Sequence, residues 1–255
     1  MTSPFGVANA LGMLHAGAVG PTAREIARLF ESSGASGKLL RKQMKSANAS
    51  LGRAVEGVEL VTANRVWLDQ SIVPEVSPVF SASVAEIYRG DGVAISLANA
   101  DAAAKAINKW ASDSTRGKIS QLIAPSALPA SAKAVVTNAV YFKGKWKTPF
   151  DANATQKMPF FVKPDQSVDV PTMNGTIALR MGQMEGLQIY ELPYGNGDFV
   201  MLIALPIDKR HTLNALEQDI DGSDIAHWSQ ALQPATVQLQ LPKFRIDPVA
   251  KSIKS

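Results

Sequence analysis

The sequence predicts a single α+β domain, and three observations lead to this prediction. Helical patterns fill the N-terminal half, strand patterns follow from about residue 134, and no strand–helix–strand rhythm of a parallel sheet is present. The chain has 255 residues, 46% of them hydrophobic, which is enough to bury a large core. No internal repeat and no low-complexity linker divides it. We therefore expect residues 1–255 to form one domain.

Four helices are expected in the first half. The first has apolar residues at the spacing of one buried helix face: Val7, Ala10, Leu11 and Leu14. The second begins with a capping box of Thr22 and Glu25. The third has a predicted buried face, Leu40, Met44, Ala47 and Leu51, and a basic face, Lys38, Arg41, Lys42 and Lys45. Asp101 is predicted to cap the fourth, residues 102–112, which buries Ala103, Ile107 and Trp110.

Strands are predicted at residues 60–68 and then through the second half. Residues 134–142 form a nearly continuous apolar run, which is typical of a central strand covered on both faces. Asn196-Gly197 lies between two apolar runs and predicts a hairpin. Farther on, Val237, Leu239 and Leu241 alternate with glutamines, as in a strand with one solvated face.

Composition and motifs argue against several classes of function. The chain has no cysteine, and its three histidines lack metal-ligand spacing, so we expect no metal, no cofactor and no thiol chemistry. No nucleophile elbow or P-loop is present, and an enzyme is therefore not predicted. The net charge of +4 is too small for a nucleic-acid binder. No apolar run is long enough to span a membrane, and the first residues do not form a signal peptide.

Several motifs in collinear order resemble those of the serpin family. The longest runs from Asn138 to Trp146 (Asn-Ala-Val-Tyr-Phe-Lys-Gly-Lys-Trp), and Phe150, Thr155 and Phe160 follow it at the spacing of the family. Ser3-Pro4 precedes the first helix, and Ile107-Asn108-x-Trp110 lies in the fourth. Three later landmarks complete the set: Leu192-Pro193-Tyr194, Leu205-Pro206 and Leu241-Pro242-Lys243-Phe244. The resemblance covers nearly the whole chain.

The resemblance implies a serpin fold, whose main sheet opens to admit a reactive loop as a new strand after a protease has cleaved that loop. By position, Ser3 and Asn138 correspond to the shutter, the polar cluster beneath the point where the sheet parts. Trp146 and Thr155 correspond to the breach, where the loop first enters. Gly6 stands where the family commonly has a second serine, so this shutter is expected to lack one hydroxyl.

The family pattern continues beyond the last motif into the reactive loop, and it also has a helix before Ser3. We therefore expect an incomplete serpin domain, without a scissile bond in these residues. For the complete protein the implied partner is a serine or cysteine protease, and the implied location is extracellular or periplasmic. The missing serpin segment could also be supplied by another chain.

Two alternatives remain open at this point. The chain is a non-inhibitory serpin body that binds a ligand or a heparin-like polyanion through Lys38, Arg41, Lys42 and Lys45, or it is an inactive gene remnant. Three N-x-S/T sequons, at Asn48, Asn153 and Asn174, carry no interpretation at the level of sequence.

Overall fold

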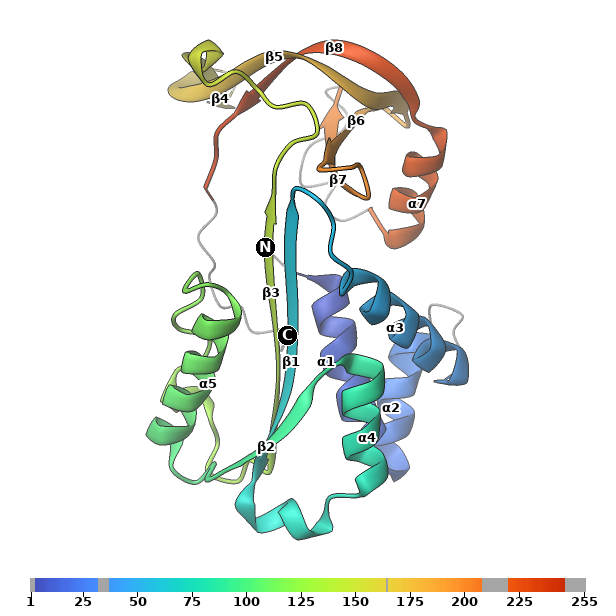
Figure 1. The fold of residues 1–255 in the computed structure, drawn as a ribbon, viewed down its shortest axis with the longest axis vertical. Coiled ribbons are helices and arrows are strands. Elements are labelled where there is room, and N and C mark those ends of the chain that lie inside the picture. Colours follow the sequence, from blue (N-terminus) through green and yellow to red (C-terminus); the bar gives the residue numbers. More distant parts are fainter. Residues whose placement is uncertain (1–2, 32–36, 164, 208–219, 246–255) are drawn as a thin grey trace. The chain divides into compact units, whose positions relative to one another are not determined.

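A computed structural model of the chain describes residues 3–31, 37–163, 165–207 and 220–245 (Figure 1). Helices combine with mostly antiparallel sheets, so the predicted α+β class is confirmed. The chain divides into two compact units. The first contains Met1–Arg53 and Glu59–Phe142, and the second contains Ala54–Val58 and Lys143–Arg245. Each unit has its own sheet and its own apolar clusters.

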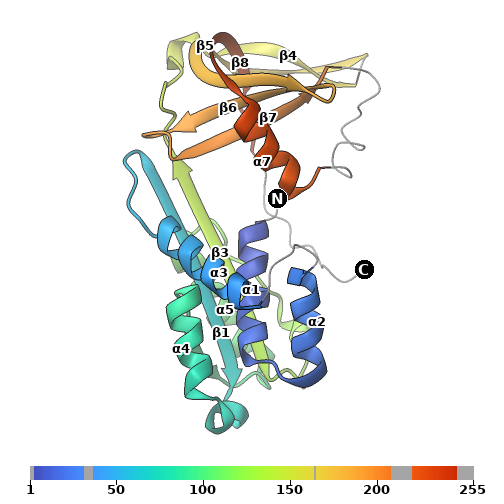
Figure 2. The ribbon, with the colours of Figure 1, turned by 90° about the vertical axis from the view of Figure 1, so that its right-hand side faces the viewer.

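The first unit is a three-stranded sheet with helices on both faces. Its strands lie in the order β2-β1-β3, formed by β2 (Asp91–Ile95), β1 (Val58–Asp69) and β3 (Ala134–Gly144). On one face lie α1 (Pro4–Gly17), α2 (Gly20–Glu31), α3 (Gly37–Leu51) and α4 (Pro78–Tyr88) (Figure 2). The other face carries α5 (Ala100–Ser114) (Figure 1). Two short 3-10 helices complete the unit, η1 (Gln70–Glu75) and η2 (Pro125–Ala127).

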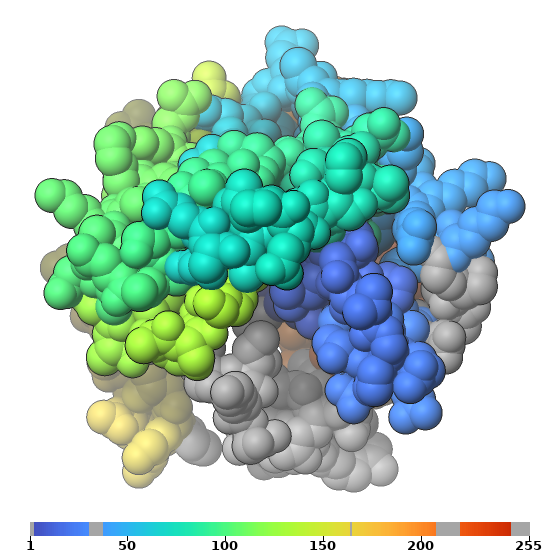
Figure 3. Space-filling view, turned by 90° about the horizontal axis from the view of Figure 1, so that it is seen from below, coloured from blue at the N-terminus to red at the C-terminus, as the bar shows by residue number. Residues whose placement is uncertain are grey.

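Each face of this sheet has its own core. Toward α5, buried side chains of strand and helix meet, among them Trp67, Ile107, Trp110 and Ala139. Toward the other helices, Met13 of α1, Met44 of α3, and Val84 and Tyr88 of α4 pack around Val66. Figure 3 views the molecule from below, with η1 and α4 (teal) crossing between α5 (green) and the first helices (blue). The sheet is therefore covered on both faces.

The second unit is a five-stranded antiparallel sheet. It contains β4 (Gln156–Lys163), β5 (Gln166–Met184), β6 (Leu187–Tyr194), β7 (Phe199–Pro206) and β8 (Gln233–Pro242). The long β5 pairs with β4, β6 and β8. Helix α7 (Gly222–Ala231) packs Trp228 against Leu187 and Ile189, and η3 (Ala152–Ala154) precedes β4. The predicted hairpin is confirmed, because β6 and β7 pair from Leu187↔Pro206 to Tyr194↔Phe199.

The predicted buried face of the first helix is wrong. The residues that α1 buries are Gly6, Asn9, Gly12 and Met13, whereas Leu14 of the predicted apolar stripe is 41% exposed. The reason lies in close packing: glycine and a short amide allow this side of α1 to approach the sheet and α4. The apolar side of α1 is only half-buried among the residues described.

Several element boundaries also differ from prediction. Helix α2 begins at Gly20, so Thr22 lies inside its first turn and does not cap it. Asn99, and not Asp101, caps α5, because its side chain accepts from the backbone N–H of Ala102 at 3.1 Å. Strand β3 is covered on both faces as predicted, but among the described residues it lies at the end of its sheet and not in the centre.

Helices α4 and α7 and strand β2 were not predicted. Of these, α4 and β2 form a β-α-β unit with β1, since β1 and β2 are parallel and pair from Arg65↔Asp91 to Asp69↔Ile95. The available signal was at the helix start, where Ser77 caps α4 and Pro78 occupies its first turn. The prediction that no strand–helix–strand unit is present is therefore wrong for this part of the chain.

Candidate functional site

Asn138 joins two strands of the first unit through its side chain. Its Nδ2 donates to Oδ1 of Asn64 at 2.8 Å and, more weakly, to the carbonyl of Ala63 at 3.4 Å. Asn64 in turn donates from Nδ2 to the carbonyl of Tyr88 at 2.7 Å. Three elements, β3, β1 and α4, are thus held by one line of amide groups. Asn64 is buried, so the hydrogen bonds to Asn138 and to the Tyr88 carbonyl take the place of those that its amide would make to water.

Ser3 lies close to the same amide, at the start of α1. Its Oγ accepts from the backbone N–H of Gly6 at 3.0 Å, which caps the helix. A Cβ placed on Gly6 would lie 2.1 Å from Oδ1 of Asn138 and 3.2 Å from Oγ of Ser3. The structure therefore brings together the two residues that the resemblance assigned to the shutter. Gly6 is the point of contact between them, and no side chain larger than hydrogen fits there in this arrangement.

A second buried amide pair lies in the same layer and was not predicted. Asn48 of α3 donates from Nδ2 to Oδ1 of Asn9 at 2.8 Å and to the carbonyl of Met44 at 2.9 Å. Asn9 and Asn48 are 0% and 1% exposed. Oδ1 of Asn48 is buried without a hydrogen-bond partner in the described part of the chain. The available signal was the position of Asn9 three residues after Gly6, on the same side of a helix.

The outer edge of β3 lies next to the amide cluster of Asn138 and Asn64. β3 ends the order β2-β1-β3, and within the described ranges no strand pairs with its outer side. An unpaired strand edge offers a row of N–H and C=O groups to another strand. The amide line from Asn138 to Asn64 fixes the inner side of β3 to β1. Chemically, an arrangement of this kind can bind another strand.

Trp146 lies in the second unit, at the centre of an aromatic cluster. Its ring stacks on Tyr194 with centroids 4.3 Å apart and an interplanar angle of 12°. It also meets Phe150 edge-to-face at 6.4 Å. The backbone reinforces the contact, because Gly195 donates to the carbonyl of Lys145 at 2.8 Å and Lys147 donates to that of Pro193 at 2.9 Å. Burial raises the pKa of the Tyr194 phenol.

Gly195 makes this tight turn possible. It has a φ of +50°, in the left-handed region, and a Cβ at this position would lie 2.1 Å from the carbonyl oxygen of Glu56. The sequence points to the glycine as part of a hairpin turn. Gly195 also packs directly against the segment 54–58. This contact joins parts of the chain that are distant in sequence, so a local pattern does not reveal it.

Thr155, the other predicted breach residue, follows η3 in the same unit. Its backbone N–H donates to the carbonyl of Ala152 at 3.3 Å, and its side chain is half-buried. The neighbouring carbonyl, that of Ala154, accepts from Nδ2 of Asn174 at 3.0 Å. Thr155 and Trp146 belong to one unit, and Ser3 and Asn138 belong to the other.

The predicted basic face on α3 exists and is solvent-exposed. Lys38, Arg41, Lys42 and Lys45 are all exposed and follow one another at helical spacing. Lys45 forms an ion pair with Glu86 of α4 at 3.6 Å, which reduces the positive charge at one end of the face. Leu40 and Met44 on the opposite side are buried as predicted, whereas Ala47 and Leu51 are half-buried.

No group of three or more histidine, aspartate or glutamate side chains is placed to hold a metal ion in the ranges described. Among those same residues, no helix has the length and apolar character needed to cross a membrane.

Comparison with known proteins places these features in a family. The family model described as "Serpin (serine protease inhibitor)" matches residues 1–252. A leukocyte elastase inhibitor from Xenopus tropicalis is 31% identical over 96% of this chain, and a glia-derived nexin from Rattus norvegicus is 32% identical over 95%. Among solved structures, the Manduca sexta serine protease inhibitor serpin-12 has a TM-score of 0.85 at 28% identity, covering 95% of this chain. Native protease nexin-1 with heparin has a TM-score of 0.84 at 29% identity and 95% coverage.

The fold and the site define an α+β protein whose main sheet presents an edge beside a cluster of buried amides. The chain belongs to the serpin family, and its relatives include protease inhibitors. It spans 66% of the length of the Xenopus relative, 61% of the rat nexin and 66% of the Manduca structure.

Proposed function

We propose that this chain is the body of a serpin-type inhibitor of serine proteases, and that β3 is the strand beside which an inserting strand docks. The observation that supports this most directly is the position of β3 at the end of its sheet, with Asn138 fixing it to β1. Ser3 and Asn138 act as the shutter, because they meet at Gly6 where α1 touches the strand. Trp146 and Thr155 act as the breach.

The proposed mechanism uses the outer edge of β3. A strand that adds beside β3 gains backbone hydrogen bonds along its whole length. The amide line of Asn138, Asn64 and the Tyr88 carbonyl lies on the inner side of β3 and joins it to β1 and α4. Charge-neutral amide bonds contribute about 1 kcal/mol each, so this line helps to keep β3 in place while a strand adds at its other side.

We further propose that residues 1–255 alone do not inhibit, and that the protein acts outside the cell or in a periplasm. The implied partner is a serine or cysteine protease. The reactive loop of the family follows the Leu241-Pro242-Lys243-Phe244 motif, so inhibition depends on residues beyond those described.

The test is the formation of a covalent complex. The full-length gene product is incubated with trypsin-like, chymotrypsin-like and elastase-like proteases and analysed by SDS gel electrophoresis. A 1:1 SDS-resistant complex with at least one protease is expected, and residues 1–255 expressed alone should form none. Cleavage of the full-length protein by all three proteases without any complex would contradict the inhibitory function.

A second function is favoured by one observation, the exposed basic face of α3. Protease nexin-1, which has a similar fold, was solved with heparin. We propose that Lys38, Arg41, Lys42 and Lys45 bind a heparin-like polyanion.

Replacement of all four basic residues by alanine should abolish salt-sensitive retention on heparin. The matched control replaces four exposed lysines of the second unit, Lys143, Lys145, Lys157 and Lys163, and should retain most of it. Equal losses of heparin retention in both variants would indicate that binding depends on total charge and not on this face of α3.

A further inference from the structure

The sequons of the chain differ in how the fold uses their asparagine amides. N-linked glycosylation acts on an asparagine that is followed, two residues later, by serine or threonine. The sugar replaces one of the two hydrogens on Nδ2, so an amide that donates both hydrogens within the fold must give up a bond to carry it. The asparagines to compare are Asn48, Asn153 and Asn174.

The amides of Asn48 and Asn174 are fully engaged in the fold. Nδ2 of Asn48 makes the two hydrogen bonds described above, and its side chain is 1% exposed. Nδ2 of Asn174 donates to the carbonyls of Ala154 and Thr172, both at 3.0 Å. A sugar on either asparagine would break one of these bonds and leave a carbonyl without its donor. Neither amide is therefore suited to accept a sugar on the folded protein.

Asn153 differs from both. It lies in η3, the short 3-10 helix before β4, and its side chain is exposed. Its backbone N–H donates to Oδ1 of Asp151 at 2.9 Å, whereas its side-chain amide has no hydrogen-bond partner within the described residues. A sugar on Nδ2 of Asn153 would therefore break no hydrogen bond that the described residues make.

The segment around Asn153 can adapt to the site of an enzyme. Asp151, Ala152 and Asn153 are exposed, and η3 is a single turn closed by backbone bonds of 3.1 and 3.3 Å. Because 3-10 turns have poorer hydrogen-bond geometry than α-helices, opening this turn costs little. Thr155 completes the sequon, and in the part of the chain that the structure describes its hydroxyl has no hydrogen-bond partner.

The residue two positions before Asn153 is acidic. Residues 151–155 read Asp-Ala-Asn-Ala-Thr, which is the extended acceptor sequence of bacterial oligosaccharyltransferases. The corresponding residues of the other two sequons, Ser46 and Thr172, carry no charge. Asp151 is exposed, and Oδ1 accepts from the N–H of Asn153. Its carboxylate can therefore also meet a cationic group of an enzyme.

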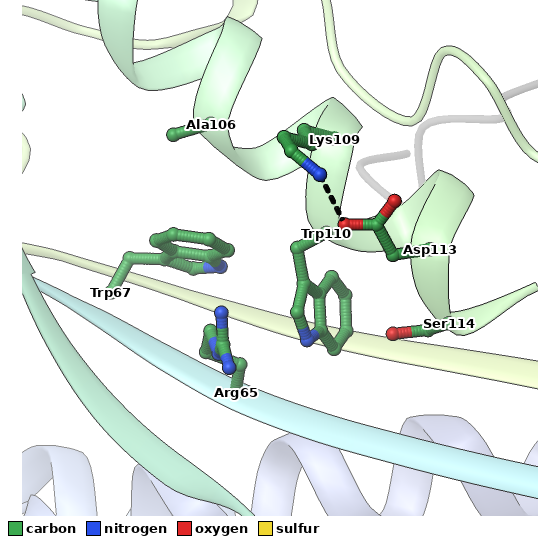
Figure 4. A pocket seen from close by; sticks show the side chains of 7 residues that line it. All are labelled: Arg65, Trp67, Ala106, Lys109, Trp110, Asp113 and Ser114. Atoms are coloured by element: carbon green, nitrogen blue, oxygen red, sulfur yellow. Dashed lines mark hydrogen bonds and ion pairs between the residues drawn. The ribbon is translucent and has the colours of Figure 1, made fainter.

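The hollow between β1 and α5 provides a contrast, because its charged groups are already paired. Lys109 and Asp113 form an ion pair with Nζ and Oδ2 2.6 Å apart, and the guanidinium of Arg65 is bound to Asp91. The hollow is lined by Arg65, Trp67, Ala106, Lys109, Trp110, Asp113 and Ser114 (Figure 4). Its two indoles are 2% and 9% exposed, so they belong to the core and not to a binding surface.

We propose that Asn153 accepts an N-linked oligosaccharide on the folded protein, and that Asp151 and Thr155 are recognised together with it. The donor is an oligosaccharide carried on a polyprenyl diphosphate. The bond between C1 of its first sugar and the diphosphate oxygen breaks, and a bond between C1 and Nδ2 of Asn153 forms. The amide releases one proton, and polyprenyl diphosphate leaves. This modification goes beyond the proposed function, since it requires neither a protease nor an inserting strand.

The test uses the full-length gene product, purified in folded form from bacteria that lack N-glycosylation. It is incubated with a bacterial oligosaccharyltransferase and a polyprenyl-diphosphate oligosaccharide, under conditions in which a free peptide of residues 149–157 is modified. Intact mass spectrometry should show the added mass of one oligosaccharide, and peptide mapping should place it on Asn153. Absence of transfer to the folded protein, or transfer to Asn48 or Asn174 instead, would overturn the proposal.

Three variants test which residues the enzyme recognises, each first shown to be folded by circular dichroism. Asn153→Gln should abolish the added mass, and Asn174→Gln, the matched control at another sequon, should leave it unchanged. Asp151→Asn keeps an oxygen that accepts from the N–H of Asn153 but removes the charge, so the rate of transfer should fall at least about tenfold. Transfer that persists in Asn153→Gln, or an unchanged rate in Asp151→Asn, would also overturn the proposal.

Discussion

Gly6 determines how closely α1 approaches β3. A methyl group there would lie 2.1 Å from Oδ1 of Asn138, far inside any normal contact. The amide cannot simply turn away, because its Nδ2 is bound to Asn64 and to the carbonyl of Ala63. The serine that the family commonly has here would demand a different position for Asn138. With glycine in place of that serine, α1 lies directly against the side chain of Asn138.

Substitution of Gly6 by alanine should destabilise the protein. The overlap with Asn138 is expected to lower the free energy of unfolding by about 1–3 kcal/mol, which outweighs the gain in helix propensity. Urea denaturation measures the change. Gly222→Ala is the control, since nothing lies within 4 Å of a Cβ at that helix position. A Gly6→Ala protein as stable as the wild type would show that helix and strand separate easily.

Asn64 and Asn138 should be energetically coupled. Their side chains share one hydrogen bond of 2.8 Å, and removal of either leaves the other without this partner. A double-mutant cycle with Asn64→Ala and Asn138→Ala should give a coupling energy of about 0.5–3 kcal/mol. The denaturant midpoints of the four proteins supply it. Strictly additive effects would mean that the amide line does not hold β3.

The contributions of individual residues were partly predictable. Asn138 stands in an apolar strand, where a polar side chain needs partners, and this alone marks it as a member of a buried network. The same signal is present at Asn64 and was not used. Gly6 was noted only as a departure from the family pattern. Its close contact with Asn138 and the burial of Asn48 could not be predicted, because both depend on which elements come within a few ångströms of these residues.

At the scale of elements, the turn after β1 is organised by Asp69. Its carboxylate accepts from the hydroxyl and the backbone N–H of Ser71 and, at 2.9 Å, from the N–H of Leu97. These bonds, the hydroxyl of Ser71 foremost, lower the pKa of Asp69 below 3.8. The turn thus connects β1, η1 and the segment before α5.

This lowered pKa predicts a dependence of stability on pH. The carboxylate stabilises the folded state above its unfolded pKa, and this contribution is lost as the pH falls through the lower pKa of the folded state. Asp69→Asn should therefore reduce stability at neutral pH, with a difference from the wild type that shrinks under acid. An NMR titration should place the Asp69 midpoint below 3.8. A midpoint at or above that value would exclude the bonds to Ser71 as a stabilising element.

Helix α7 is attached to its sheet through an ion pair whose carboxylate is buried. Arg180 of β5 bonds Glu191 of β6 at 2.9 Å and the carbonyls of Ser229 and Leu232 at 2.7 and 2.9 Å. The Glu191 side chain is only 9% exposed. Glu191→Gln should lower the free energy of unfolding by about 2 kcal/mol, as for the loss of a charged hydrogen bond. Thermal denaturation followed by circular dichroism measures it.

The exposed pair of Lys45 and Glu86 provides the comparison for this prediction. Its atoms are 3.6 Å apart and both side chains are mostly in solvent, so Glu86→Gln should cost less than about 1 kcal/mol. Similar losses in Glu86→Gln and Glu191→Gln would show that burial does not distinguish the two pairs.

Helices and strands were predictable to different degrees. The hairpin at Asn196-Gly197 and the buried side of α5 follow from local pattern and are confirmed. The orientation of α1 is not, because the apolar stripe of its sequence is not the side that packs against the described residues. Helix α4 and strand β2 are short and lack a clear period, so only their caps could have revealed them.

For the whole molecule, the exposed surface predicts self-association. Large apolar side chains are exposed in both units, including Val19, Val79 and Phe161, and β3 presents an unpaired edge within the described ranges. Residues 1–255 expressed alone should therefore form oligomers or aggregates. Size-exclusion chromatography with light scattering measures this. A soluble monomer with one cooperative melting transition would contradict this prediction. It would show that the exposed apolar side chains and the edge of β3 do not drive association.

The burial of Asn48 bears on how the protein can be produced. The sequence Asn48-Ala49-Ser50 is a recognised acceptor for N-linked sugar, yet its amide nitrogen is bound to Asn9 and Met44 inside the helical layer. An oligosaccharyltransferase can reach it only on the nascent chain, and a sugar added there would keep α1 and α3 apart. Eukaryotic secretory hosts are therefore a poor choice for this protein, and bacterial expression avoids the conflict.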